Sequence, residues 1–291
     1  MVNLLELSRK KHLWHGILFV IVSIFVFGNA VSMGIFSMEG ISHSWGVVVA
    51  IALLLFGLFL LFAGKGFLEN GGVVAEYYEA IVMAVGIAFM VRTFVVEPFK
   101  IPSGSMIPTL LVGDYLFVNK FAYGYRIPFT QQRIFMSGSP ARGEIAVFEY
   151  PKDPTKDYIK RIVGLPGDRI LYRDRVLYVN GQQVSQKPEG PYSYLNENEM
   201  QVEAQRLQES LGSNAYSILL RQYGNLEPIT DIVIPAGYFF VLGDNRDNSN
   251  DSRFWGLVPG YRLVGRAVAM FWSWDRNEGK PRWERLGQAI K

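Results

Sequence analysis

The fold of the second half of the chain is indicated most clearly by residues 157–168, which read DYIKRIVGLPGD. The first part of this stretch is rich in β-branched and aromatic residues and is typical of a strand. The LPGD that follows predicts a tight turn, because proline presets φ and glycine supplies a positive φ. In an extended strand, Lys160 shares a face with Tyr158 and Ile162. Arg161 then points to the opposite face, so the stretch predicts a strand that holds an amine among apolar side chains.

Short runs of the same kind continue from residue 97 to residue 291 and alternate with Gly and Pro turns. This sequence pattern predicts a mainly antiparallel β domain of about 190 residues, a normal size for one domain. Asn180-Gly181 adds a hairpin signal. The expected strands are Tyr115–Phe121, Glu144–Tyr150, Tyr158–Val163, Ile170–Tyr172, Val176–Val179, Tyr238–Leu242 and Leu263–Trp272.

One segment of this domain, residues 183–230, departs from the β pattern. Its apolar residues at helical spacing are Met200, Ala204, Leu207 and Leu211. Gly212 offers a C-terminal stop for such a helix. We therefore expect a small α/β insertion that caps or flanks the β core.

The N-terminal third of the chain is apolar enough to suggest membrane spans. Hydrophobic residues make up 49% of the sequence, and a helix needs about 20 apolar residues to cross a bilayer. No Asp, Glu, Lys or Arg occurs at 12–38 or at 40–64. We expect a cytoplasmic N-terminus at 1–13, transmembrane helices at 14–38, 44–64 and 77–96, and an extracytoplasmic domain at 97–291.

Flanking charge sets the expected orientation. Basic residues at 9–11 precede the first segment, the next loop has no Lys or Arg, and Lys65 follows the second segment. The positive-inside rule then places the N-terminus in the cytoplasm, and three crossings place the β domain outside. Two alternatives stay open. The first segment can be a cleaved signal peptide, and the third, interrupted by Glu79 and Arg92, can be an amphipathic surface helix.

Few side chains in this sequence are suited to catalysis. The chain has no Cys, and its histidines, His12, His15 and His43, all lie near the N-terminus. A Ser-His-Asp triad or a Cys-His pair within the β domain is therefore excluded. A serine nucleophile there needs a lysine or a carboxylate as its base. No basic run is long enough to indicate nucleic-acid binding.

Ser105 lies in the loop 102–108, PSGSMIP, directly after the third apolar segment. The two flanking prolines keep this loop out of a helix interior or a central strand. Gly104 permits a backbone geometry that exposes the serine, and a backbone amide helped by the Ser103 hydroxyl can form an oxyanion hole. An ordinary Ser/Gly/Pro linker has the same composition, so the loop alone leaves both interpretations open.

Lys160 is the candidate base for such a serine. An amine among apolar neighbours is desolvated, which lowers its pKa toward the range that a general base needs near neutral pH. The alternative is an edge strand whose charged residues prevent aggregation. The spacing by itself does not decide between the two.

The loop 243–256, GDNRDNSNDSRFWG, looks at first like a calcium loop. With Asp247 in the first position, however, Ser252 stands where an EF-hand needs glycine and Val258 stands where it needs glutamate. We expect instead a polar loop whose carboxylates pair with Arg246 and Arg253 and support a nearby site. We expect no metal and no organic cofactor.

Taken together, these blocks closely resemble bacterial type I signal peptidases, the leader peptidases with a Ser/Lys dyad. Four blocks in this order are far more specific than any one of them. They are Pro102–Pro108 with Thr109-Leu110 and Gly113-Asp114; Arg142–Glu144 with Val147-Phe148; Asp157–Asp168; and Gly243–Arg253 with Trp255-Gly256.

The resemblance implies a role for each matching polar residue. Ser105 matches the nucleophile, and Lys160 matches the general base. Ser103 matches the residue whose hydroxyl joins the Ser105 amide in the oxyanion hole. Ser249 matches the residue that hydrogen-bonds and orients the lysine.

The resemblance also implies a supporting ion pair between Asp251 and Arg253. It further implies a cleft with two small apolar pockets for the residues at −1 and −3 of the cleavage site, which gives an Ala-x-Ala preference. The matching cleft residues are Phe99, Ile101, Pro102, Met106, Leu110, Leu116, Val147, Asp157, Tyr158 and Ile159.

By the same resemblance the protein would be a membrane-bound serine endopeptidase that cleaves signal peptides from exported preproteins. It would be a multi-pass protein of the bacterial inner membrane with its catalytic domain, 97–291, on the periplasmic side. We expect signal peptides and membrane lipid as partners and no nucleic acid, and the sequence leaves the oligomeric state open. Trp272 and Trp274 are candidates for contact with the membrane interface.

Two departures from the family pattern bear on topology and on the insertion. Many members have one or two spans where three are expected here, and the insertion lacks the cysteine pair of some relatives. Two other functions stay open: a self-cleaving repressor-type Ser/Lys peptidase, and a catalytically inactive, membrane-anchored binding module. The apolar segments argue against the first, and the presence of both Ser105 and Lys160 argues against the second.

Overall fold

The chain forms two compact units, Met1–Thr93 and Phe94–Lys291. The computed structural model describes residues 11–32, 51, 54–58, 73, 77, 80–81, 84, 87–88, 91, 96–124, 138–196, 200–212, 214–222 and 229–290. The two units are treated separately below.

The described part of the first unit contains the helix α2, Lys11–Ser32, which has 22 residues. This helix covers the beginning of the membrane span expected at 14–38. Among the residues that the structure describes, no helix combines the length and the apolar character needed to cross a bilayer. Most of the spans expected at 44–64 and 77–96 lies outside the described residues.

The second unit is built on an antiparallel sheet of eight strands in the order β1-β2-β14-β3-β4-β12-β13, with β15 paired to β14. The sheet brings together strands that are far apart in the sequence, since β14 lies between β2 and β3. The strands are β1 (Val96–Lys100), β2 (Asp114–Asn119), β3 (Ile145–Tyr150), β4 (Asp153–Gly164), β12 (Tyr238–Leu242), β13 (Val258–Pro259), β14 (Leu263–Asp275) and β15 (Lys280–Pro281).

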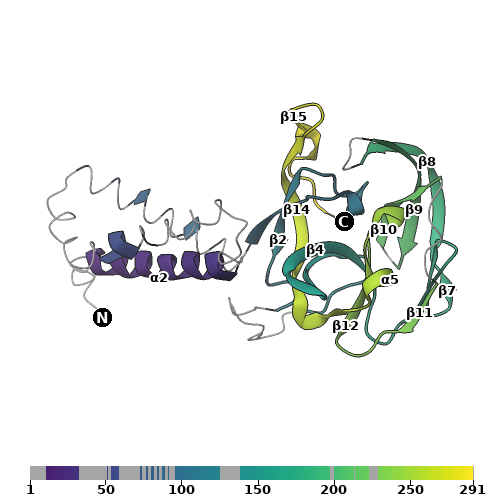
Figure 1. Ribbon diagram of the computed structural model, residues 1–291, viewed down its shortest axis with the longest axis horizontal. Helices are drawn as coiled ribbons and strands as arrows, with labels where there is room; N and C mark the ends of the chain where they lie inside the picture. Colours follow the sequence, from purple (N-terminus) through teal and green to yellow (C-terminus); the bar gives the residue numbers. More distant parts are fainter. Residues whose placement is uncertain are drawn as a thin grey trace. The chain divides into compact units, whose positions relative to one another are not determined.

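Two smaller antiparallel sheets complete the unit. One has the order β11-β5-β6-β7 and the other the order β10-β9-β8. In Figure 1 the β8–β10 sheet lies on one side of the domain, and β2 and β14 lie on the other. The strands are β5 (Arg169–Arg173), β6 (Val176–Val179), β7 (Gln182–Gln183), β8 (Ser185–Leu195), β9 (Gln201–Leu211), β10 (Asn214–Arg221) and β11 (Thr230–Val233). The short helices are η2 (Gly104–Met106), η3 (Arg246–Asn248), α5 (Ser252–Trp255), η4 (Gly260–Arg262) and η5 (Trp283–Arg285).

The prediction of a mainly antiparallel β domain is confirmed, and so are the two turns. The backbone N–H of Asp168 donates to the carbonyl oxygen of Leu165 at 3.0 Å, and Gly167 has φ +90°. Asn180 and Gly181 both have positive φ between β6 and β7. Each expected strand overlaps an observed one, although the ends differ: β4 begins at Asp153 where Tyr158 was expected, and β14 ends at Asp275 where Trp272 was expected.

The prediction of a helix in the insertion is wrong. The apolar residues from Ala204 to Leu211 belong to β9, the middle strand of the β8–β10 sheet. The register of β8 against β9 shifts between Pro188 and Gly190. Beside this irregularity, two successive buried positions of β9, Ala204 and Leu207, are three residues apart. From Leu207 onward every second residue of β9 is buried again. A strand whose inward face changes phase produces the spacing of Ala204, Leu207 and Leu211 that resembles a helix, whereas Met200 lies before β9 and is exposed. The insertion is therefore a β sheet among its described residues.

Strand β4 holds its central residues in place from several directions. Ile159, Ile162 and Val163 are each buried, and each packs in a different apolar cluster of the domain. Both faces of the second half of β4 are therefore covered, although its first half is largely exposed. The side chains of residues 160 and 161, which lie between these anchors, have little freedom to move.

Candidate active site

Ser105 and Lys160 meet in the structure although 55 positions separate them in the sequence. Ser105 lies in the short helix η2, which follows β1, and Lys160 lies in β4. The Nζ atom of Lys160 donates a hydrogen bond to Ser105 Oγ at 2.6 Å and another to the carbonyl oxygen of Ile159 at 2.9 Å. Only 7% of Ser105 and 4% of Lys160 are exposed. The pair predicted from the sequence is thus in direct contact and largely shielded from water.

Burial shifts the proton affinity of this lysine. Desolvation lowers the pKa of Lys160 to about 8, and the negative charges of Asp251 and Asp244 oppose that shift. The Tyr158 ring lies 5.5 Å from Nζ and contributes to the apolar surroundings. An amine with this pKa is largely neutral in mildly alkaline solution and can accept a proton there. The physical reason is the one expected from the strand pattern.

The loop before the helix η2 places a second hydroxyl beside Ser105. Ser103 has an extended backbone, and its Oγ atom lies 3.5 Å from Ser105 Oγ. This separation is at the upper limit of a hydrogen bond, so the two hydroxyls are neighbours and not a tight pair. Ser103 is therefore close enough to take part in binding a group held at Ser105.

The loop 243–250 packs directly against the backbone of Ser105. The backbone N–H of Asn245 donates to the carbonyl oxygen of Ser105 at 3.1 Å. A Cβ atom added to Gly243 would lie 2.5 Å from that same carbonyl oxygen and 2.2 Å from Ser249 Oγ. Only glycine fits at this position, because the Ser105 carbonyl oxygen belongs to the backbone and cannot turn aside as a side chain could.

Asp251 and Arg253 form a two-point ion pair, with Nε and Nη2 of Arg253 each 2.8 Å from a carboxylate oxygen of Asp251. Asp251 also accepts from the backbone N–H of Gly243 at 3.0 Å, and Arg253 donates to the carbonyl oxygen of Arg246 at 2.7 Å. Both side chains are buried. The pair thus fixes the two ends of the loop that packs on Ser105.

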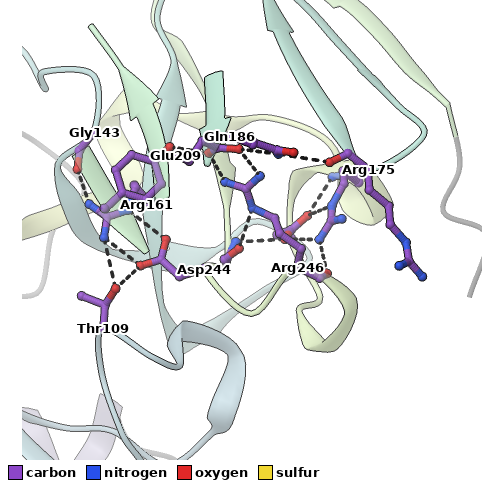
Figure 2. Close-up of polar contacts among 12 residues, drawn as sticks. Thr109, Gly143, Arg161, Arg175, Gln186, Glu209, Asp244 and Arg246 are labelled. Carbon is purple, nitrogen blue, oxygen red and sulfur yellow. Dashed lines mark hydrogen bonds and ion pairs between the residues drawn. The ribbon is translucent and has the colours of Figure 1, made fainter. Parts of the chain in front are cut away.

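The prediction that Arg246 pairs with a carboxylate of its own loop is wrong. Arg246 instead makes a two-point ion pair with Glu209 of β9, and both side chains are fully buried. Figure 2 shows this pair, with Gln186 also donating to Glu209. The sequence offered no signal for it, because Glu209 lies on a strand that resembled a helix.

Asp244 of the same loop pairs with the strand that carries the lysine. Arg161 Nε and Nη2 lie 2.8 and 2.7 Å from the two carboxylate oxygens of Asp244, and Thr109 donates to the same carboxylate (Figure 2). The guanidinium of Arg161 also donates to the carbonyl oxygen of Gly143 at 2.7 Å and lies 3.9 Å from the centroid of the Tyr216 ring. Arg161 therefore faces away from Lys160, as the strand pattern predicts.

Ser249 reaches the same cavity as the dyad but makes no hydrogen bond to Lys160 in this structure. Its hydroxyl is buried and has no hydrogen-bond partner among the described residues. The role of orienting the lysine, implied by the family resemblance, stays a prediction.

A cavity of about 640 Å³ opens at the dyad. Its lining contains five of the ten cleft residues implied by the resemblance, namely Phe99, Pro102, Asp157, Tyr158 and Ile159. The other five, Ile101, Met106, Leu110, Leu116 and Val147, are fully buried in one apolar cluster with Ile159 and do not line the cavity. They form the packed layer behind its wall.

Four lining residues were not among the predicted site residues. They are Asp247, Asn248, Asn250 and Phe254, all from the loop 243–256. The signal available in the sequence is the polar character of that loop, which predicts support for a nearby site and not a lining role. The loop in fact provides one wall of the cavity as well.

The chain is similar to known proteins over most of its length. A family model described as "Signal peptidase, peptidase S26" matches residues 74–272. Signal peptidase I of Pseudomonas aeruginosa is 42% identical over 235 residues, covering 76% of this chain and 81% of that protein. Signal peptidase I of Pseudomonas fluorescens is 41% identical with the same coverage.

A crystal structure of a signal peptidase I from Enterococcus faecalis covers 44% of this chain and 97% of its own, at 28% identity and a TM-score of 0.27. The assignment does not depend on this structural alignment. It depends on the family match, which includes both Ser105 and Lys160, and on relatives more than 40% identical over three quarters of the chain. The chain therefore belongs to the signal peptidase family, peptidase S26.

Proposed function

We propose that this protein is a serine endopeptidase that removes N-terminal signal peptides from exported preproteins with Ser105 and Lys160 as its catalytic dyad. The observation that carries the proposal is the 2.6 Å contact between Lys160 Nζ and Ser105 Oγ at the edge of an open cavity. Membership in the signal peptidase family supports the substrate class.

The reaction follows from the protonation state of the lysine. With Lys160 neutral, the Ser105 hydroxyl can donate to Nζ, and its oxygen attacks the carbonyl carbon of the scissile peptide bond as the proton moves to the amine. Lys160 then returns the proton to the leaving nitrogen, which becomes the new N-terminal amine of the mature protein. The signal peptide remains as an ester on Ser105. A water molecule, deprotonated by Lys160, hydrolyses this ester and restores the dyad.

The developing negative charge on the carbonyl oxygen needs hydrogen-bond donors. We assign this role to the backbone N–H of Ser105 and the hydroxyl of Ser103, whose Oγ is 3.5 Å from the nucleophile. We assign Ser249 to orienting the lysine, because its buried hydroxyl lies in the same cavity and has no partner among the described residues. Asp251 and Arg253 then hold the loop that carries Ser249.

The cavity suits small apolar side chains of the substrate. Its wall near the dyad includes Phe99, Pro102 and Ile159. Behind this wall lies a close-packed apolar cluster, which gives the wall little room to move outward. We therefore propose pockets that accept alanine-sized side chains at −1 and −3 of the cleavage site.

We also propose that the protein acts at the bacterial inner membrane, with its catalytic domain on the periplasmic side. The uncharged apolar stretches at 12–38 and 40–64 support attachment to the bilayer. The β domain exposes tryptophans: 39% of Trp274 and 65% of Trp283 are accessible. The Trp272 ring lies against Trp283 at a centroid distance of 5.8 Å. Exposed indole rings favour the membrane–water interface.

The test is cleavage of a preprotein by the purified full chain, with the cut mapped by mass spectrometry. Ser105→Ala removes only a hydroxyl, and we expect it to lower the rate by about 10⁴-fold or more with the fold unchanged. Ser185→Ala, which alters an exposed serine of β8, is the matched control and should cleave like the wild type. Processing by Ser105→Ala at the wild-type rate would show that another residue is the nucleophile.

A further inference from the structure

The β8–β10 sheet of the insertion, here called the insertion sheet, contacts every residue from 244 to 247 of the loop 243–250, here called the catalytic loop. Each strand of the sheet takes part, and the contacts involve backbone, neutral and charged groups. They join Leu219 N–H to the Asp244 carbonyl at 2.8 Å, Asn245 Nδ2 to Tyr194 Oη at 2.9 Å, Arg246 to Glu209, and Arg221 N–H to Asp247 Oδ2 at 2.7 Å. Figure 2 shows the third of these. The loop is thus held along its length by a segment outside the motif blocks.

Within this loop, Asn245 is the residue that reaches the nucleophile. Its backbone N–H donates to the carbonyl oxygen of Ser105 at 3.1 Å, and its Nδ2 donates to the carbonyl oxygen of Gly104 at 3.0 Å. The side chain is completely buried. Asn245 therefore holds the peptide units on both sides of the Ser105 Cα atom.

The chemistry of the partners fixes the orientation of the Asn245 amide. The Gly104 carbonyl oxygen can only accept, so the amide nitrogen must face it. That nitrogen carries two hydrogens, and the second is donated to the Tyr194 hydroxyl oxygen at 2.9 Å. Tyr194 Oη also lies 3.4 Å from Nη2 of Arg221, which donates to it. The Tyr194 hydroxyl is thus placed to set the angle of the amide plane.

We propose that Tyr194 of strand β8 is a positioning residue for the nucleophile: through Asn245 it sets the position of the Gly104–Ser105 backbone. This inference rests on the proposed function. Tyr194 does not line the cavity at the dyad, so its effect is on the alignment of Ser105 and not on substrate binding. Misplacement of a reacting group by about 1 Å can lower a rate by about 100-fold.

Tyr194→Phe tests this directly, because it removes the hydroxyl oxygen and keeps the ring that packs on the cluster containing Ile107 and Leu219. We expect kcat to fall about tenfold, equivalent to about 1.4 kcal/mol, with KM changed less than about twofold. The fall should be the same at every pH, because the surroundings of Lys160 are not altered. Thermal unfolding and active-site titration confirm that equal amounts of folded enzyme are compared.

The matched control is Tyr192→Phe on the same strand. Tyr192 packs on the same cluster, and its hydroxyl makes no hydrogen bond with the described residues. We expect this variant to keep the wild-type kcat. A Tyr194→Phe protein with wild-type kcat and only a lower melting temperature would overturn the proposal. It would show that the Tyr194 hydroxyl stabilises the fold and does not align Ser105. A rise in KM at constant kcat would also overturn the proposal.

The result is distinguishable from failure of the proposed function itself. If the wild type does not cleave a preprotein, or if Ser105→Ala still does, the proposed function is wrong. If both behave as expected and Tyr194→Phe matches the wild type, only the positioning role is wrong.

Discussion

Lys160 has to be neutral to accept a proton, and its surroundings determine when that happens. Burial lowers its pKa to about 8, against the opposing attraction of Asp251 and Asp244. Below this pH the amine is protonated and cannot take the proton of Ser105. We therefore expect kcat/KM to rise with pH through about 8, where an exposed lysine would require a pH above 10. A pH–rate profile of the free enzyme measures this limb, and a limb centred above pH 10 would contradict the burial argument.

Lys160→Arg separates the proton-accepting role from mere positive charge. Guanidinium does not lose its proton in the accessible pH range, so we expect activity to fall by about 10²–10⁴-fold or more. Lys156→Arg, on the exposed part of the same strand, is the control and should be fully active. A Lys160→Arg enzyme with normal turnover would leave the carboxylates of the loop 243–251 as the next candidates for the base.

Among the elements, the insertion sheet and the catalytic loop share a buried ion pair. Glu209→Gln keeps the shape but leaves the Arg246 charge buried without its carboxylate. Removing one partner of such a pair costs about 3–5 kcal/mol of unfolding free energy, which denaturant melts measure. Asp231→Asn, which breaks an exposed pair with Arg169, is the control and should change stability little, because water screens that pair. Equal losses in the two variants would show that burial does not set the cost.

We expect the cavity wall formed by β1 and β4 to limit the size of the substrate side chain at −1. A preprotein with Phe in place of Ala at −1 should not be cleaved, because a phenyl ring cannot enter a close-packed pocket without strain. Cleavage is followed by gel shift and by mass spectrometry, with a Ser at −1 as the small-residue control. Equal rates for Ala and Phe would indicate a broad-specificity protease.

Several strands of the domain were predictable because each has a local signal. The strand at β4 has β-branched residues and ends in a Pro-Gly turn, and β6 ends in Asn180-Gly181, so periodicity and turn chemistry agree. Strand β9 has no such agreement. The buried positions of β9 change phase next to the register shift between β8 and β9. This change depends on how β9 pairs with β8, and the spacing of apolar residues within β9 alone cannot predict it.

For the candidate site, the sequence predicted the pairing of Ser105 with Lys160 and the strand geometry that separates Lys160 from Arg161. It did not predict that the loop 243–256 lines the cavity or that Arg246 pairs with Glu209. Both depend on contacts between segments more than 30 positions apart. The cleft residues Met106 and Val147 illustrate the same limit, since a motif match does not say whether a side chain lines a cavity or lies behind its wall.

For the whole molecule, the charge pattern of the N-terminal third predicts the side of the membrane on which the chain ends. With the N-terminus inside and three crossings, Lys291 lies outside. Protease added to sealed, right-side-out spheroplasts should then digest a C-terminal tag and spare an N-terminal tag. Lysed spheroplasts, in which both tags are digested, are the control. Protection of the C-terminal tag would mean two crossings or the reverse orientation.

Among the described residues of the catalytic domain, three arginines are buried, each beside one carboxylate. The pairs are Arg161–Asp244, Arg246–Glu209 and Arg253–Asp251. Loss of one member leaves a charge that the interior does not tolerate, whereas loss of both can be nearly neutral. A lineage that changes one codon at a time must therefore pass through a poorly folding intermediate to alter any pair. We therefore expect the two members of a pair to change together, and we expect a chimera that takes the loop 243–256 from a homologue to fold well only if it also takes that homologue's partner for position 246.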